Sequence, residues 1–134
     1  MYKKILVALS LDHGISERAL RTARKLLDEG GTIEALHVIE QIPEYAHQQL
    51  KEGQDEVNYN RAMDGLKERI GEAADVKATV LVGHAGRAIP EHAEKVGSDC
   101  IVIGSHEPSL ADFFLGSTAE RIVRHAKSSV HVIR

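Results

Sequence analysis

The sequence is poor in cysteine and carries no excess of basic residues. Its single cysteine, Cys100, cannot form an internal disulfide, so we expect a reducing compartment and a buried, unreactive thiol. Seventeen Lys and Arg residues stand against twenty Asp and Glu, which gives a net charge of −3. This balance offers no electrostatic reason to expect a nucleic acid partner.

Long apolar runs are also missing. No window approaches the ~20 apolar residues that a membrane span needs. The N-terminal run MYKKILVALSLD is interrupted by Ser10 and Asp12 and has no cleavage-like site, which predicts a strand rather than a signal peptide. We therefore expect a cytoplasmic protein without membrane association, in which the 134 residues, 43% of them hydrophobic, form one domain.

Several motifs of catalytic and nucleotide sites are absent. The sequence has neither GxGxxG nor GxxxxGK[ST]. Its eight histidines show no HxxxH or HExxH spacing, and scattered solvated histidines account for them more simply than a metal site. No GxSxG marks a nucleophilic serine, and no general base for hydrolysis can be identified. These absences favour a binding protein over an enzyme.

Short runs rich in Ile, Val and Leu alternate with helical patterns, which is typical of βα units and a parallel sheet. The runs are KILVAL (4–9), TIEALHVI (32–39), KATVLV (77–82), DCIVIG (99–104) and SVHVIR (129–134). Runs that are apolar at every position suit central strands covered by helices on both faces. The last run alternates less cleanly and predicts an edge strand that could pair with another subunit.

Four stripes of apolar residues at helical spacing are predicted to face the core. The first helix follows Ser16 as its N-cap and stops at Gly30–Gly31, and the third opens near Pro90. A polar connector, residues 43 to 54, leads into the second helix. The stripes are Ala19, Leu20, Ala23, Leu26 and Leu27; Ala62, Met63, Leu66 and Ile70; Ile89, Ala93 and Val96; and Ala119, Ile122, Val123 and Ala126.

One stretch, GSHEPSLADFFLGST (104–118), lies where a parallel sheet binds its ligands, at the carboxyl end of a strand. Gly104 would end the strand, and Gly116, Ser117 and Thr118 would begin a helix whose N–H groups could hold an anion. Ser117 with Glu120 three residues later also fits a capping box. The local pattern alone favours the cap.

From end to end the chain resembles the universal stress protein family, most specifically in IVIGSH and LGSTAERIVRHA. The resemblance implies a doubly wound, five-stranded parallel sheet, Rossmann-like or flavodoxin-like, as in the adenine nucleotide alpha hydrolase-like fold. It also implies a homodimer paired through the last strand, at Val130 and Val132, and in many members a bound ATP.

The ATP-binding members share a pattern of Gly, two residues, Gly, nine residues, Gly, and then Ser or Thr. Gly104 matches the first glycine, and Gly116 with Ser117 matches the last pair. Glu107 replaces the second glycine, and the spacing to Gly116 is one residue shorter, as in a branch of the family with a similar GSHxP loop. A carboxylate near a triphosphate is repulsive unless it points to solvent or reaches a metal ion.

The resemblance also implies contacts with the nucleoside. Ser10 stands where the family usually has Asp, with Asp12 two residues further, and either would face the ribose. Val38 matches an adenine-side valine and Gly83 the glycine after the third strand, although a core residue and a plain turn explain these two equally well. The phosphates would lie with Gly104, Gly116, Ser117 and Thr118, beside Ser105 and His106, and His13 or His84 could join them.

Three functions are therefore compared. The favoured one is a cytoplasmic, dimeric stress-response sensor or regulator that binds ATP, or AMP or ADP, with Mg²⁺ as a reasonable companion because no lysine sits in the stretch. The second is a dimeric interaction module that has lost nucleotide binding, marked by Glu107 and Ser10. The third is a slow ATPase or autophosphorylating enzyme.

Overall fold

A single parallel sheet organises the chain in the computed structural model, which describes residues 1–11, 16–41, 53–71, 73, 75–105 and 115–134. Its strands lie in the order β3-β2-β1-β4-β5. They are β1 (Tyr2–Ala8), β2 (Leu27–Glu40), β3 (Val76–Gly83), β4 (Cys100–Gly104) and β5 (Ser129–Ile133). Because the order reverses between β1 and β4, the sheet is doubly wound, and the predicted fold class is confirmed.

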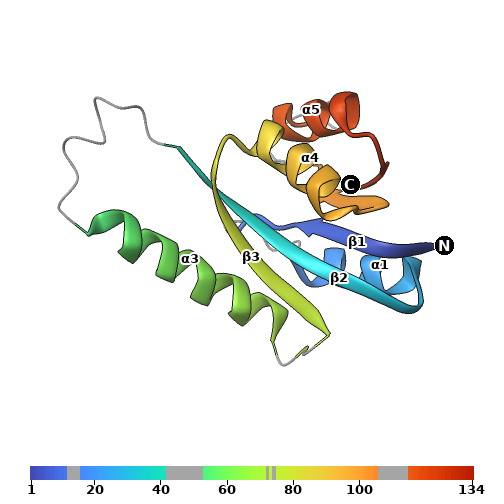
Figure 1. Ribbon diagram of the computed structural model, residues 1–134, viewed down its shortest axis with the longest axis horizontal. Helices are drawn as coiled ribbons and strands as arrows, with labels where there is room; N and C mark the ends of the chain where they lie inside the picture. Colours follow the sequence, from blue (N-terminus) through green and yellow to red (C-terminus); the bar gives the residue numbers. More distant parts are fainter. Residues whose placement is uncertain (12–15, 42–52, 72, 74, 106–114) are drawn as a thin grey trace.

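Helices cover both faces of the sheet. α1 (Ser16–Leu26) and α3 (Gln54–Ile70) lie on one face, and α4 (Ala85–Val96) and α5 (Ser117–His125) lie on the other (Figure 1). Each face of the sheet has its own core. The core under α1 and α3 contains Val7 of the sheet with Leu20 and Leu66 of these helices, and the core under α4 and α5 contains Ile101 of the sheet with Ile122 of α5. The predicted connector, residues 43 to 54, falls almost entirely outside the described residues.

The central strand β1 shows why the run KILVAL has no polar alternation. Ile5, Leu6 and Val7 are all 0% exposed. Leu6 belongs to the core under α4 and α5, whereas Ile5 and Val7 belong to the core under α1 and α3. A strand buried on both faces needs an apolar residue at every position.

The predicted helix stripes are confirmed in the main, with two corrections. α4 begins at Ala85 and not near Pro90, which lies inside the helix, where a proline removes only one backbone donor. Val123 is 47% exposed, so the prediction that it faces the core is wrong. The buried face of α5 is formed by Ala119 and Ile122, and Val123 lies beside that face.

The glycine pair predicted to stop the first helix lies instead within β2. α1 ends at Leu26, and β2 begins at the next residue. The pairing of β1 with β2 then skips, because Tyr2 is opposite Leu27 whereas Lys4 is opposite Thr32. Gly30, with φ of 81°, and Gly31 occupy this skip. The conformational freedom of these two glycines therefore allows the irregular start of β2 and does not end a helix.

The last strand lies at an edge of the sheet, as predicted. β5 pairs with β4, from Cys100 opposite Ser129 to Gly104 opposite Ile133. Val130 and Val132 are partly buried against the core under α4 and α5. Cys100 is fully buried as predicted, and burial raises the pKa of its thiol to about 11. No helix among the described residues is long and apolar enough to cross a membrane.

Two histidines are held by the fold, so the prediction that the histidines are solvated is wrong for them. His92 Nε2 on α4 lies 2.7 Å from Glu34 Oε2 on β2, with side-chain exposures of only 12% and 8%. His37 Nδ1 lies 2.9 Å from the carbonyl oxygen of Leu9. A buried carboxylate must be paired, and the histidine on the covering helix supplies that partner.

Replacing Glu34 with glutamine is expected to lower the free energy of unfolding at pH 7 by about 1–3 kcal/mol, because it removes a buried charge-assisted hydrogen bond. Burial raises the pKa of Glu34, but the hydrogen bond and the charge of His92 outweigh burial and leave the pKa below its usual value. The stabilisation is therefore present at neutral pH and is lost as the pH falls below the ordinary range of a glutamate. Thermal melts of both proteins between pH 3 and 7 check this, and a difference that persists unchanged at pH 3 would contradict it.

Candidate functional site

The backbone at the end of β4 is hydrogen-bonded to β5. Gly104 is the last residue of β4 and lies opposite Ile133 of β5. The N–H of Ser105 donates to the carbonyl oxygen of Ile133 at 2.7 Å. The backbone donor of Ser105 therefore belongs to the sheet, and only its hydroxyl is left for a ligand. His106 and Glu107 lie outside the described residues.

The start of α5 lacks the predicted capping box. Gly116 is the N-cap, with φ of −59° and ψ of 153°, and no side chain caps the helix. Ser117 is the first helical residue, which places Glu120 one position too late to close a box. The Glu120 carboxylate pairs instead with Arg124 one turn further, at 2.9 Å.

This uncapped start leaves backbone donors without a helical partner. The first bond of α5 runs from the N–H of Glu120 to the carbonyl oxygen of Gly116, at 2.9 Å. The N–H groups of Ser117, Thr118 and Ala119 therefore have no acceptor within the helix. Ser117 and Thr118 are exposed, and the positive end of the helix dipole lies here. Such an end suits a phosphate or a carboxylate.

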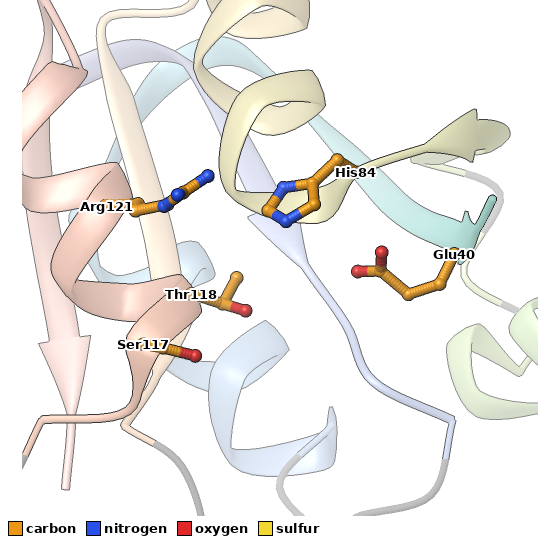
Figure 2. A pocket seen from close by; sticks show the side chains of 5 residues that line it. All are labelled: Glu40, His84, Ser117, Thr118 and Arg121. Atoms are coloured by element: carbon orange, nitrogen blue, oxygen red, sulfur yellow. The ribbon is translucent and has the colours of Figure 1, made fainter. Parts of the chain in front are cut away.

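A hollow of about 320 Å³ lies beside this helix start (Figure 2). Its walls come from α5, from the start of α4 and from the end of β2. The side chains that line it are Glu40, His84, Ser117, Thr118 and Arg121. Figure 2 shows the guanidinium of Arg121 directed toward His84, and the Glu40 carboxylate facing the same imidazole from the other side. Glu40 Oε1 accepts a hydrogen bond from the N–H of Ala85 at 3.2 Å and so satisfies the start of α4.

The other predicted residues lie at the same edge of the sheet, at different strands. Val38 is partly buried on the α4–α5 side of β2, two residues before Glu40. Ser10 follows the end of β1 and is partly buried. Gly83 ends β3, where its carbonyl oxygen accepts from the N–H of Gln41 at 2.9 Å and an added Cβ would find room. Gly83 therefore fits a plain turn, and Asp12 lies outside the described residues.

Sequence reasoning missed two lining residues, Glu40 and Arg121. Arg121 follows Ser117 by four residues, so the two share one face of a helix. Glu40 follows Val38 by two residues, so the two share one side of a strand. Both periodicities were readable from the sequence once Ser117 and Val38 had been singled out.

No group of three or more His, Cys, Asp or Glu side chains within the described ranges could hold a metal ion. The structure instead brings together, at this edge of the sheet, N–H groups with no acceptor within their helix, two hydroxyls and a guanidinium.

Comparisons with known proteins show the family and support the fold. The model of the universal stress protein family matches residues 1–134. Universal stress protein G of Shigella flexneri is 30% identical over 145 residues, covering all of both chains. The structure of UspA from Lactobacillus plantarum superposes with a TM-score of 0.78 at 22% identity, over 99% of this chain and 98% of that one. A universal stress protein of Archaeoglobus fulgidus in complex with dAMP has a TM-score of 0.67 at 22% identity, over 99% and 98% of the chains.

Proposed function

Because the chain belongs to the universal stress protein family, we propose that it binds an adenine nucleotide at the carboxyl edge of its sheet, with the phosphates on the first turn of α5. The observation that carries the proposal is the uncapped start of this helix, where Ser117, Thr118 and Ala119 offer N–H groups beside a hollow. A phosphate there accepts these donors and lies at the positive end of the helix dipole.

The remaining roles of the described residues follow from their positions, and those of Asp12 and His106 follow from the family resemblance. Val38, on the same side of the sheet as the hollow, faces the adenine, and Ser10, after β1, contacts the ribose together with Asp12. Gly104 and Gly116 let the backbone approach the phosphates, because neither has a side chain in the way. Gly83 borders the site, and the Ser105 hydroxyl and His106 flank the phosphates.

ATP, accompanied by Mg²⁺, is the nucleotide we propose, with AMP or ADP as related ligands. The relative from Archaeoglobus fulgidus forms a complex with dAMP, which supports the adenine nucleotide class. Mg²⁺ is usually held by phosphates and one or two carboxylates, and Glu40 provides a carboxylate in the hollow. On this proposal the protein is a cytoplasmic stress-response regulator that reports nucleotide supply, and neither hydrolysis nor phosphate transfer is part of its role.

The direct test is mass spectrometry of any nucleotide released from the purified protein, followed by melting curves with ATP and Mg²⁺. A ligand at 100 times its Kd stabilises the folded protein by about 2.7 kcal/mol, which is a rise of several degrees in the melting temperature. We expect that rise with ATP and none with the same concentration of UTP. Absence of any released nucleotide, together with a flat melting temperature at millimolar ATP, would count against the proposal and favour an interaction module.

We propose in addition that two copies pair through β5. Two observations support this arrangement. β5 is an edge strand, which offers backbone groups along its outer side. α5, which packs over β5, carries the exposed apolar side chain of Val123 on its surface.

Replacing Val130 with aspartate is expected to convert the dimer into a monomer, measured by light scattering. Val130 is partly buried against the core under α4 and α5, so circular dichroism must show that the variant keeps its fold. The same change at exposed Thr32, on β2 away from the edge, is the control and leaves the mass unchanged. A folded Val130→Asp protein with the mass of a dimer would refute pairing through β5.

A further inference from the structure

We propose that Arg121, together with His84, forms a subsite for the distal phosphates of the nucleotide, so that the hollow selects a di- or triphosphate over a monophosphate. The inference rests on the proposed function and concerns two residues that lie outside the glycine and hydroxyl pattern of the stretch 104–118. It assigns a ligand to the part of the hollow that lies beyond the first turn of α5.

The first step is the charge balance of the hollow. Its charged side chains are the guanidinium of Arg121 and the carboxylate of Glu40. Glu40 is already compensated by the N–H of Ala85, at the positive start of α4. Neither a carboxylate nor a carbonyl oxygen of the described residues accepts a hydrogen bond from Arg121. Within the part of the chain that the structure describes, the charge of Arg121 is therefore available to a bound anion.

The second step is the packing of the Arg121 side chain against α4. Gly86 is buried in the first turn of α4, and a Cβ at this position would lie 2.8 Å from Cδ and 3.2 Å from Cβ of Arg121. The stem of Arg121 thus lies directly over the glycine, which brings the two helices together and directs the guanidinium toward His84 (Figure 2). The absence of a side chain at Gly86 therefore makes room for the aliphatic part of Arg121 against the first turn of α4.

The third step is distance along the helix. Arg121 follows Ser117 by four residues, which is a rise of about 6 Å along α5. A phosphate on the N–H groups of the first turn leaves the guanidinium available to the next phosphates of a chain, because Figure 2 shows it directed toward His84 and not toward Ser117. Guanidinium groups bind phosphate oxygens through paired hydrogen bonds, and the exposed His84 lies on the opposite wall of the hollow.

The test compares AMP, ATP and inorganic tripolyphosphate by titration calorimetry at fixed ionic strength, with the wild type and with Arg121→Met. Methionine keeps an unbranched stem over Gly86 and removes only the charged end. We expect the wild type to bind ATP at least tenfold more tightly than AMP. In Arg121→Met this preference falls to less than threefold, tripolyphosphate binding weakens at least tenfold, and the Kd of AMP stays within twofold.

The matched control is Arg124→Met, because Arg124 lies three residues after Arg121 on the same helix but pairs with Glu120 outside the hollow. This variant should keep the wild-type Kd for all three ligands. Equal loss of AMP and ATP binding in Arg121→Met would overturn the subsite, as would equal affinity of the wild type for AMP and ATP, and both leave nucleotide binding standing. Tripolyphosphate that binds the wild type in an Arg121-dependent way, while neither nucleotide binds, would instead support the subsite and overturn the proposed function.

Discussion

Replacing Ser117 with aspartate is expected to weaken the binding of ATP by about 5- to 1000-fold while leaving the protein as stable as before, or slightly more so. Ser117 is the exposed first residue of α5, so the new carboxylate lies where the proposed phosphate accepts its N–H groups. Two like charges about 4 Å apart repel by about 1–4 kcal/mol between water and a protein surface, and each 1.4 kcal/mol is a tenfold loss. The same carboxylate stabilises the start of a helix by about 0.3–1 kcal/mol.

Opposite changes in binding and stability separate this prediction from simple damage to the fold. Calorimetry with ATP and melting curves without ligand measure the two effects on the same preparation. His125→Asp adds an equal charge at the far end of α5, where it should lower the melting temperature slightly and leave the Kd unchanged. A Ser117→Asp protein that binds ATP as tightly as the wild type would show that the phosphates lie elsewhere.

Replacing Gly31 with alanine is expected to cost about 3 kcal/mol of unfolding free energy, the upper end of the usual range for overpacking. An added Cβ would lie 2.7 Å from the carbonyl oxygen of Lys3 and 2.6 Å from Cδ1 of Leu27. The leucine can turn away, but the carbonyl oxygen is part of β1. The two strands must therefore separate where the ladder between them already skips.

Gly30→Ala is the matched control for Gly31→Ala, one residue away. An added Cβ on Gly30 meets nothing within 4 Å, and its only cost is the φ of +81°, about 1 kcal/mol. Urea unfolding of the three proteins should therefore give a clearly larger loss for Gly31→Ala than for Gly30→Ala. Equal losses would mean that backbone conformation, and not the close approach of β1 and β2, determines the need for this glycine pair.

The sequence predicted the layers of the fold well because each layer depends on repeated burial. Ile5, Leu6 and Val7 are apolar in succession, and only a strand covered on both faces explains that run. The boundaries were predicted less well. A Gly-Gly pair has the same appearance after a helix as in a bulged strand, and only the position of Lys3 across the sheet decides between them. A proline predicts the first turn of a helix, because inside a helix it costs one hydrogen bond. Around Pro90 the packing of Ile89 and Ala93 offsets that cost.

The sequence predicted where Ser117 and Thr118 lie in the fold, but not the side chains that surround them. Ser117 and Thr118 do begin the last helix at the carboxyl edge, yet the capping box expected there is absent, because the helix starts one residue earlier than a box requires. Arg121 and Glu40 could not be assigned to the same hollow from local patterns, since they lie on elements far apart in the sequence. The need for glycine at position 86 could not be predicted either, because it depends on the side chain of Arg121, which lies over it in the fold.

The central claim is that an adenine nucleotide binds on the first turn of α5, and a ¹H–¹⁵N NMR titration with ATP tests both the binding and its place. We predict saturable shifts in the amide signals of Ser117, Thr118 and Ala119. The amides of Lys3 and Lys4, which donate to Asp99 at the opposite edge of the sheet, should stay unchanged. An unchanged spectrum at millimolar ATP, or shifts that leave these three α5 amides untouched, would contradict the claim.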